Sequence, residues 1–307
     1  MFHLPFKAMK EIDIKLPTGW LDLSFDQLKM VARTHIRYAA MMDRDRFKLF
    51  VRTDLFFKLG GLKVIRIEQE SMDSDDLCYL VQRDSEEFRI RTFQIQYWTE
   101  KHLEWLFETP TLVSLPVETM SVQKSRIYHV PPAMMNGFSW RRFRLACDMI
   151  EYYAGCSNNM IRLLNQENPN TARIAQVNKE INLSKAEFLS TLFTRDKDDS
   201  PFSLDRLERY EKDMLQVSDE WFQIILFWWE SVMNRLMKIY PRVFSEQGMK
   251  TDRVKDPMTV YSRTVATLEK YLSLPEDKIN EETYTNILQH LDDILLQNEE
   301  IENMRRK

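Results

Sequence analysis

The stretch WFQIILFWWESVMNRLMKIY, from Trp221 to Tyr240, decides the fold of this chain. It predicts one helix over 219–240, because Ser218 before it is a good N-cap and Pro241 after it cannot extend a helix. One stripe of that helix holds the polar residues Gln223, Glu230, Asn234 and Lys238. Nearly every other position is apolar, so we expect the helix inside a helical domain with neighbours on two sides.

The N-terminal residues 1–109 predict a small α+β module. Ser24 and Gln27 have the spacing of a capping box, which opens a first helix. A second helix is expected over Arg46–Leu59, and a third begins at about Thr92.

Four short stretches of this module alternate like strands, and they are Ile12–Leu16, Leu62–Glu68, Leu77–Val81 and Phe88–Ile90. The last two are separated by polar residues and predict a β-hairpin. The acidic stretch MDSDD at Met72–Asp76 lacks the central Gly and terminal Glu of a calcium loop, so it predicts a solvated loop.

Residues 110–137 lose this periodicity and contain four prolines, which predicts a Pro-containing linker. Residues 138–307 predict an α-helical domain built around helix 219–240. Its other expected helices cover residues 140–154, 183–193, 204–215, 258–272 and 281–304. Gly155 is expected to end the first of them. The predicted fold class is therefore mainly α, a small α+β N-terminal module of helices plus a β-hairpin, followed by an α-helical C-terminal domain.

The composition supports large cores and a mostly helical chain. Hydrophobic residues make up 44% of the 307 residues and aromatic residues 12%, whereas only six glycines are present. The net charge is −4, which does not favour nucleic acid or an anionic membrane as a partner. The longest uncharged apolar run in the central helix is Trp221–Trp229, far short of the roughly 20 residues that span a bilayer. We therefore expect no membrane association and a soluble, reducing, cytoplasmic context.

No residue pattern predicts an enzyme, a metal site or a cofactor. The histidines are scattered without a cysteine or a second histidine at ligand spacing, so they are expected to be solvated or hydrogen-bonded. Cys78, Cys147 and Cys156 sit in apolar surroundings and are expected to be buried thiols. The sequence contains no phosphate-binding glycine loop and no nucleophile-elbow motif.

Trp140, Arg141, Arg142 and Arg144 form the one cluster of basic and aromatic residues. It could bind phosphate or an acidic partner. The alternative, which the acidic net charge favours, is that the arginines lie on the solvated side of an amphipathic helix with Trp140 at the margin of the core.

Phe227 lies on the polar stripe of the central helix, between Gln223 and Glu230. Either another helix of the same domain covers it, or it is exposed and marks a partner surface. Intramolecular cover is favoured, because Trp228 and Trp229 beside it imply burial over a wide arc.

Several segments resemble those of one group of phage proteins: IKLPTGWLDLSFDQL (Ile14–Leu28), LVQRDSEEFRIRTFQI (Leu80–Ile95), FSWRRFRLACDMIEYY (Phe138–Tyr153), WWESVMNRLMKIYPRVF (Trp228–Phe244) and the charged terminal helix. The group is a largely uncharacterised family encoded by phages and prophages of gut Bacteroidales. The likeness covers most of the chain, fits poorly at Asn165–Asn178, and brings no catalytic motif.

The resemblance implies a non-enzymatic protein-interaction role in phage tail or virion assembly, as a tail-assembly chaperone or a tail or connector component. It also implies other phage structural or assembly proteins of the tail or tape-measure type as partners, and a location in the host cell cytoplasm or in the virion. The alternative hypothesis is a nucleic-acid-binding regulatory protein that uses the Arg141–Arg144 cluster.

Overall fold

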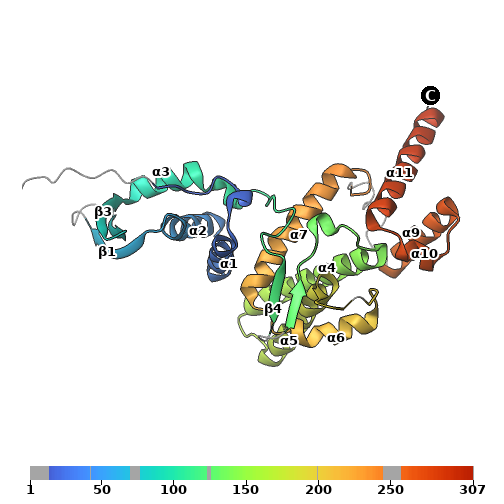
Figure 1. Cartoon of the computed structure of the whole chain (residues 1–307), viewed down its shortest axis with the longest axis horizontal. Helices are drawn as coiled ribbons and strands as arrows, with labels where there is room; N and C mark the ends of the chain where they lie inside the picture. Colours follow the sequence, from blue (N-terminus) through green and yellow to red (C-terminus); the bar gives the residue numbers. More distant parts are fainter. Residues whose placement is uncertain are drawn as a thin grey trace, which may run out of the picture. The chain divides into compact units, whose positions relative to one another are not determined.

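The computed structural model describes residues 14–41, 43–69, 77–122, 126–198, 200–244 and 257–306. It is 64% helical and contains two small three-stranded antiparallel sheets, with an α+β N-terminal region and a helical C-terminal part (Figure 1). The predicted fold class is therefore confirmed.

The chain folds into two compact units. The first unit comprises Met1–Leu112 and Asp219–Ser231, and the second comprises Val113–Ser218 and Val232–Lys307. Helix α7 (Asp219–Ile239), which was predicted as the centre of one domain, contributes its first half to the first unit and its remainder to the second. The predicted domain limits themselves stay a prediction. No helix of the described residues has the length and apolarity to cross a membrane.

The first unit begins with helices whose N-termini are capped as the sequence suggests. Its elements are η1 (Trp20–Asp22), α1 (Phe25–Tyr38), α2 (Arg44–Leu59), β1 (Lys63–Gln69), β2 (Leu77–Arg83), β3 (Glu86–Arg91), α3 (Thr92–His102) and η2 (Glu104–Phe107). The Ser24–Gln27 capping box is present at α1. Helix α2 starts two residues earlier than predicted, because the Asp43 side chain accepts hydrogen bonds from the backbone amides of Asp45 and Arg46.

The sheet of the first unit has the order β1-β2-β3 and contains the predicted hairpin. Asp84 and Ser85 join β2 to β3, and both have positive φ, as tight hairpin turns require. The predicted strand Ile12–Leu16 is wrong for residues 14–16, which lie outside any strand and run into Pro17. Its first two residues, and the MDSDD stretch, lie outside the described residues.

The second unit contains the other sheet and most of the long helices. Its elements are β4 (Thr119–Val122), β5 (Arg126–His129), η3 (Ala133–Met135), α4 (Trp140–Leu164), α5 (Thr171–Leu192), β6 (Thr194–Arg195), α6 (Leu204–Met214), α9 (Pro257–Leu272), α10 (Glu276–Glu281) and α11 (Tyr284–Arg306). Strands β4 and β5 lie in the stretch that was predicted as a linker. They are too short to show clear alternation, and β5 pairs with β6, more than sixty residues further along the chain.

Helices α4 and α5 are both longer than predicted. Gly155 lies inside α4, where a glycine costs only about 1 kcal/mol relative to alanine, and α4 packs along α5. Helix α5 starts at Thr171, inside the polar stretch, because the Asn170 side chain caps it through the amide of Arg173. The polar sequence therefore gave no prediction of the first half of α5, although the second half of the same helix is buried.

The predicted terminal helix is interrupted before α11. The backbone at 282–284 leaves the helix and bonds to the start of α4: the amide of Trp140 donates to the carbonyl of Glu282 at 2.7 Å, and the amide of Tyr284 donates to the carbonyl of Phe138 at 3.1 Å. Ser139 and Thr283 form an isolated antiparallel bridge between the same segments. These long-range bonds replace the helical ones, and they separate α10 from α11.

Helix α7 is buried over most of its first half, as its composition predicted. Trp228 is fully buried, and Ile224, Ile225 and Phe227 are at most 5% exposed. Gln223 is half-buried and Glu230 is exposed, so the apolar surface surrounds the helix except along one stripe.

The substitution Trp228→Ala tests whether this helix stabilises the fold. Removing a fully buried indole should lower the free energy of unfolding by about 3–5 kcal/mol, as measured by urea denaturation. The control Trp98→Ala truncates a tryptophan that is 41% exposed and should cost much less. An unchanged denaturation midpoint for Trp228→Ala would refute the role assigned to α7.

Candidate protein-interaction site

Phe227 is covered within the first unit. Its ring centroid lies 4.9 Å from that of Trp20 and 5.2 Å from that of His35. One turn later, the Ser231 hydroxyl donates to the carbonyl of Phe227 at 2.7 Å and accepts from the amide of Leu112 at 2.9 Å. The cover is intramolecular, as the sequence favoured, and it leaves Phe227 5% exposed. It comes from residues of the predicted N-terminal module, however, and not from another helix of the predicted C-terminal domain.

A cavity of about 380 Å³ lies beside Phe227. Aromatic rings form much of its wall, including those of Trp20, Phe47 and Phe107, and Arg44 and Glu230 line it as well. Glu230 is exposed as a residue, but partial burial of its carboxyl raises the pKa of that group. Basic and acidic side chains both line the cavity beside the aromatic rings. This mixture of charges does not indicate one class of ligand.

His35 packs as a neutral aromatic ring in the wall of this cavity. Its ring meets Phe47 edge-on at 5.6 Å, and its Nε2 atom is buried without a hydrogen-bond partner among the described residues. Burial lowers the pKa of His35 to about 4, so the imidazole is neutral at physiological pH. The expectation of a solvated or hydrogen-bonded histidine is wrong for this nitrogen, because aromatic packing takes the place of a polar partner.

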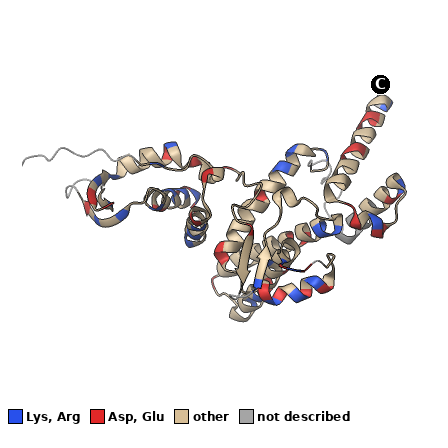
Figure 2. Cartoon of the chain, in the orientation of Figure 1, with Lys and Arg blue, Asp and Glu red and all other residues tan. Residues whose placement is uncertain are grey.

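The predicted cluster of Trp140 and three arginines does not form one surface. Arg141 is exposed, whereas Arg144 is half-buried and lies 3.6 Å from Asp148. Basic and acidic residues are interspersed along the helices of both units (Figure 2). The helix that carries the cluster therefore does not present three arginines to a single phosphate.

Arg142 points into the second unit, so its predicted place on the solvated side of α4 is wrong. Its guanidinium donates to the carbonyls of Thr191 and Leu192 at 2.6 and 2.9 Å and stacks on Phe138 at 3.7 Å. Burial, together with the charge of Arg206, lowers the pKa of Arg142 to about 9. The arginine closes the C-terminal end of α5, where helix carbonyls lack partners.

Trp140 belongs to the core and is not at its margin. It is 6% exposed and stacks with Phe143 at 5.9 Å between ring centroids. Its burial follows from the bonds that join the start of α4 to Glu282 and Tyr284.

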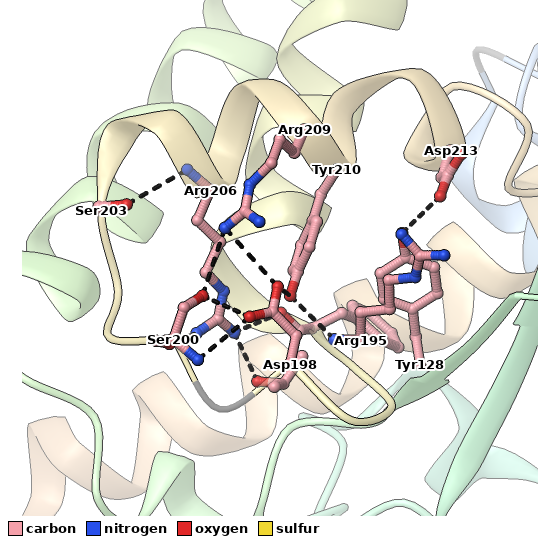
Figure 3. Close-up of polar contacts among 11 residues, drawn as sticks. Tyr128, Arg195, Asp198, Ser200, Ser203, Arg206, Arg209, Tyr210 and Asp213 are labelled. Atoms are coloured by element: carbon pink, nitrogen blue, oxygen red, sulfur yellow. Dashed lines mark hydrogen bonds and ion pairs between the residues drawn. The ribbon is translucent and has the colours of Figure 1, made fainter.

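A polar network of the second unit joins α6 to the sheet (Figure 3). Asp213, which is 1% exposed, accepts a hydrogen bond of 2.6 Å from the Tyr128 hydroxyl and forms an ion pair with Arg126. Burial raises the pKa of Tyr128, and Asp213 adds to the increase. No sequence motif predicts this contact, because its members lie 85 residues apart.

Asp198 lies in a second set of polar contacts, which also includes residues of α6 (Figure 3). It accepts hydrogen bonds from the amide and hydroxyl of Ser200 and, at 2.6 Å, from the Tyr210 hydroxyl. These bonds hold the pKa of Asp198 well below its usual range. The carboxylates of Asp213 and Asp198 are therefore both bound by neighbouring donors, which fits a structural role.

The cysteines are shielded from solvent. Cys78 and Cys156 are buried, and no disulfide joins any of the three. Cys147 is partly exposed as a residue, but burial of its thiol raises the pKa to about 12. Within the described residues, no group of three or more histidine, cysteine or acidic side chains is placed to hold a metal ion.

Helix α3 presents three aromatic side chains to solvent: Phe93, Tyr97 and Trp98 are 52%, 58% and 41% exposed. We call them the α3 aromatic face. Phe93 and Tyr97 are one helical turn apart and therefore neighbours on the helix surface. The sequence pattern places Trp98 near one face of this helix together with Ile95, but Ile95 is buried and Trp98 is exposed.

Replacing His35 by phenylalanine tests the neutral histidine. As the pH falls from 6.5 to 4, the unfolded chain gains a proton that folded His35 excludes, so wild-type stability should fall by up to about 3 kcal/mol. His35→Phe should lack this loss in urea denaturation series across that pH window. His129→Phe, which replaces an exposed histidine, should behave like the wild type; an equal loss in His35→Phe would contradict the assignment.

Truncating Asp213 tests the network of the second unit. Asp213→Ala leaves Tyr128 and Arg126 without their buried acceptor and should lower the free energy of unfolding by about 2–3 kcal/mol. Glu208→Ala removes an exposed carboxylate from the same helix and should stay within about 0.5 kcal/mol of the wild type. Equal denaturation midpoints for the two variants would show that the network does not stabilise the fold.

Comparison of the chain with known protein families, with curated proteins and with solved structures finds no match.

Proposed function

We propose that this protein has a non-enzymatic protein-interaction role in phage tail or virion assembly, as a tail-assembly chaperone or a tail or connector component. The α3 aromatic face is the observation that carries the proposal. Phenylalanine, tyrosine and tryptophan are enriched at the centres of protein interfaces, where they bury large apolar areas with few rotatable bonds.

The geometry of this face supports docking of a folded partner. The Tyr97 and Trp98 rings contact each other edge to face at 6.2 Å, and Trp98 stacks on His102 at 5.0 Å. The Lys101 ammonium lies 5.7 Å from the centroid of the Tyr97 ring. These contacts hold the rings in place before binding, which reduces the entropy that an interface must overcome.

The phage context comes from the resemblance of the sequence segments to phage and prophage proteins. It gives the class of partner to be tested: structural or assembly proteins of the tail, and tape-measure proteins in particular. The guanidinium of Arg142 is engaged by the carbonyls of Thr191 and Leu192, which removes one cation from the cluster on which the nucleic-acid alternative relied, so we do not propose that alternative.

Co-expression with tail and tape-measure proteins of the encoding phage, followed by affinity capture, tests the proposal. The full chain should capture one of them, and Phe93→Ala/Tyr97→Ala should reduce recovery at least about tenfold, because buried aromatic side chains dominate interface energies. Both side chains are exposed, so the variant should keep the wild-type denaturation midpoint.

The matched control is Ile161→Ala/Leu164→Ala, which truncates two side chains of α4 that are 54% and 56% exposed. It should capture the partner as the wild type does. Capture of no virion protein by the wild-type chain would refute the assembly role, and equal loss in both variants would refute the α3 aromatic face as its site.

A further inference from the structure

Strand β1 is an open edge of the first unit's sheet. The sheet order β1-β2-β3 leaves one side of its backbone without a strand neighbour among the residues described. Three of its apolar side chains, Val64, Ile65 and Ile67, are 37%, 45% and 53% exposed. An edge with exposed apolar side chains and unpaired backbone groups is a template for another strand.

The strand is regular only in its second half. The register with β2 shifts between Val64 and Arg66, and from there pairing runs without interruption to Gln69. Ile67 lies opposite Tyr79, whose ring contacts Phe57 of α2 at 5.3 Å. Any strand added at this edge would therefore extend the face that packs on α2.

Arg66 and Glu68 lie on the other face of the strand. They form an ion pair with each other, and Glu68 also lies 3.4 Å from Arg89 of β3. Side chains alternate between the two faces over the regular part of the strand. Arg66 and Glu68 therefore give the edge a charged face, and Ile67 lies on the opposite, apolar face.

When two copies of a strand pair about a two-fold axis, residues at equal distances from the axis lie opposite each other. An axis at Arg66 would place two arginines together, and one at Glu68 would place two glutamates together. An axis at Ile67 instead places Ile67 against its counterpart, and Arg66 of each copy against Glu68 of the other. Of these three arrangements, only the axis at Ile67 avoids opposed like charges, which destabilise a strand pair. Axes at Val64 and Ile65 would lie at the register shift, where the strand is irregular.

We propose that β1 pairs with β1 of a second copy of this chain, antiparallel and about a two-fold axis at Ile67. The sequence Arg66-Ile67-Glu68 is self-complementary, and pairing covers the exposed Ile67 of both copies. The other edge strand, β3, has no side chain among the exposed large hydrophobic residues, so its pairing would bury less apolar surface. This dimer does not depend on the proposed assembly role.

Charge reversal tests the register. One strand pair is a small interface, so we expect reversible dimerisation in the micromolar range or weaker, measured by sedimentation equilibrium of the full chain. Arg66→Glu and Glu68→Arg should each weaken dimerisation at least about tenfold, because each places two like-charged pairs across the axis.

Mixing the two reversed variants provides the decisive measurement. In a heterodimer of Arg66→Glu and Glu68→Arg, both cross-strand pairs join charges of opposite sign. The mixture should therefore form a heterodimer, although each variant alone dimerises weakly. The double variant Arg66→Glu/Glu68→Arg should dimerise like the wild type. Melting curves of each variant show whether its fold is intact.

The control Glu87→Arg reverses an exposed charge on β3 and should leave dimerisation unchanged. A wild-type chain that stays monomeric at every concentration, as it would if another segment or another protein occupied the edge, overturns the proposal. Dimerisation that is insensitive to the β1 reversals, or sensitive to Glu87→Arg, also overturns it, since the interface would then lie elsewhere.

Discussion

The first half of helix α7 must be covered on nearly all sides, and the first unit is organised to provide that cover. Trp20 and His35 pack on Phe227, and Ser231 joins the helix to the backbone of Leu112 by a buried hydrogen bond. His35 is held neutral for the same reason: a charged imidazole among aromatic rings would lose its hydration without gaining a partner. The aromatic content of one helix thus sets the protonation state of a residue nearly two hundred positions earlier in the chain.

Local signals in the sequence were sufficient for the elements that form from neighbouring residues. The Ser24–Gln27 capping box, the hairpin between β2 and β3 and the whole of α7 depend on short-range pattern, and each is present. Strand β5 pairs with β6 across more than sixty residues, and its partner is two residues long, so no local pattern could reveal it. Gly155 and the polar residues at the start of α5 predicted breaks where the structure has helix. Packing between α4 and α5 outweighs the low helix propensity of these residues.

The candidate site was harder to predict than the fold, because the charge or aromaticity of a side chain does not determine whether it points into the core or to solvent. Arg142 was expected on the solvated side of α4, but its guanidinium binds backbone carbonyls at the C-terminal end of α5. The carboxylates of the buried Asp213 and the half-buried Asp198 are bound by neighbouring donors. The apolar groups at the surface, on α3 and β1, have no comparable cover among the residues described. This contrast supports recognition of other proteins as the proposed activity.

The shielded thiols have a practical consequence. A thiol must ionise before it attacks an electrophile, and at a pKa of about 12 the thiolate fraction of Cys147 at neutral pH is negligible. Cys78 and Cys156 are protected by burial. A cysteine introduced at an exposed position such as Tyr97 would therefore react with a maleimide dye far faster than the three native thiols. A variant with one introduced cysteine can therefore carry a single fluorescent label at that position without removal of the native cysteines.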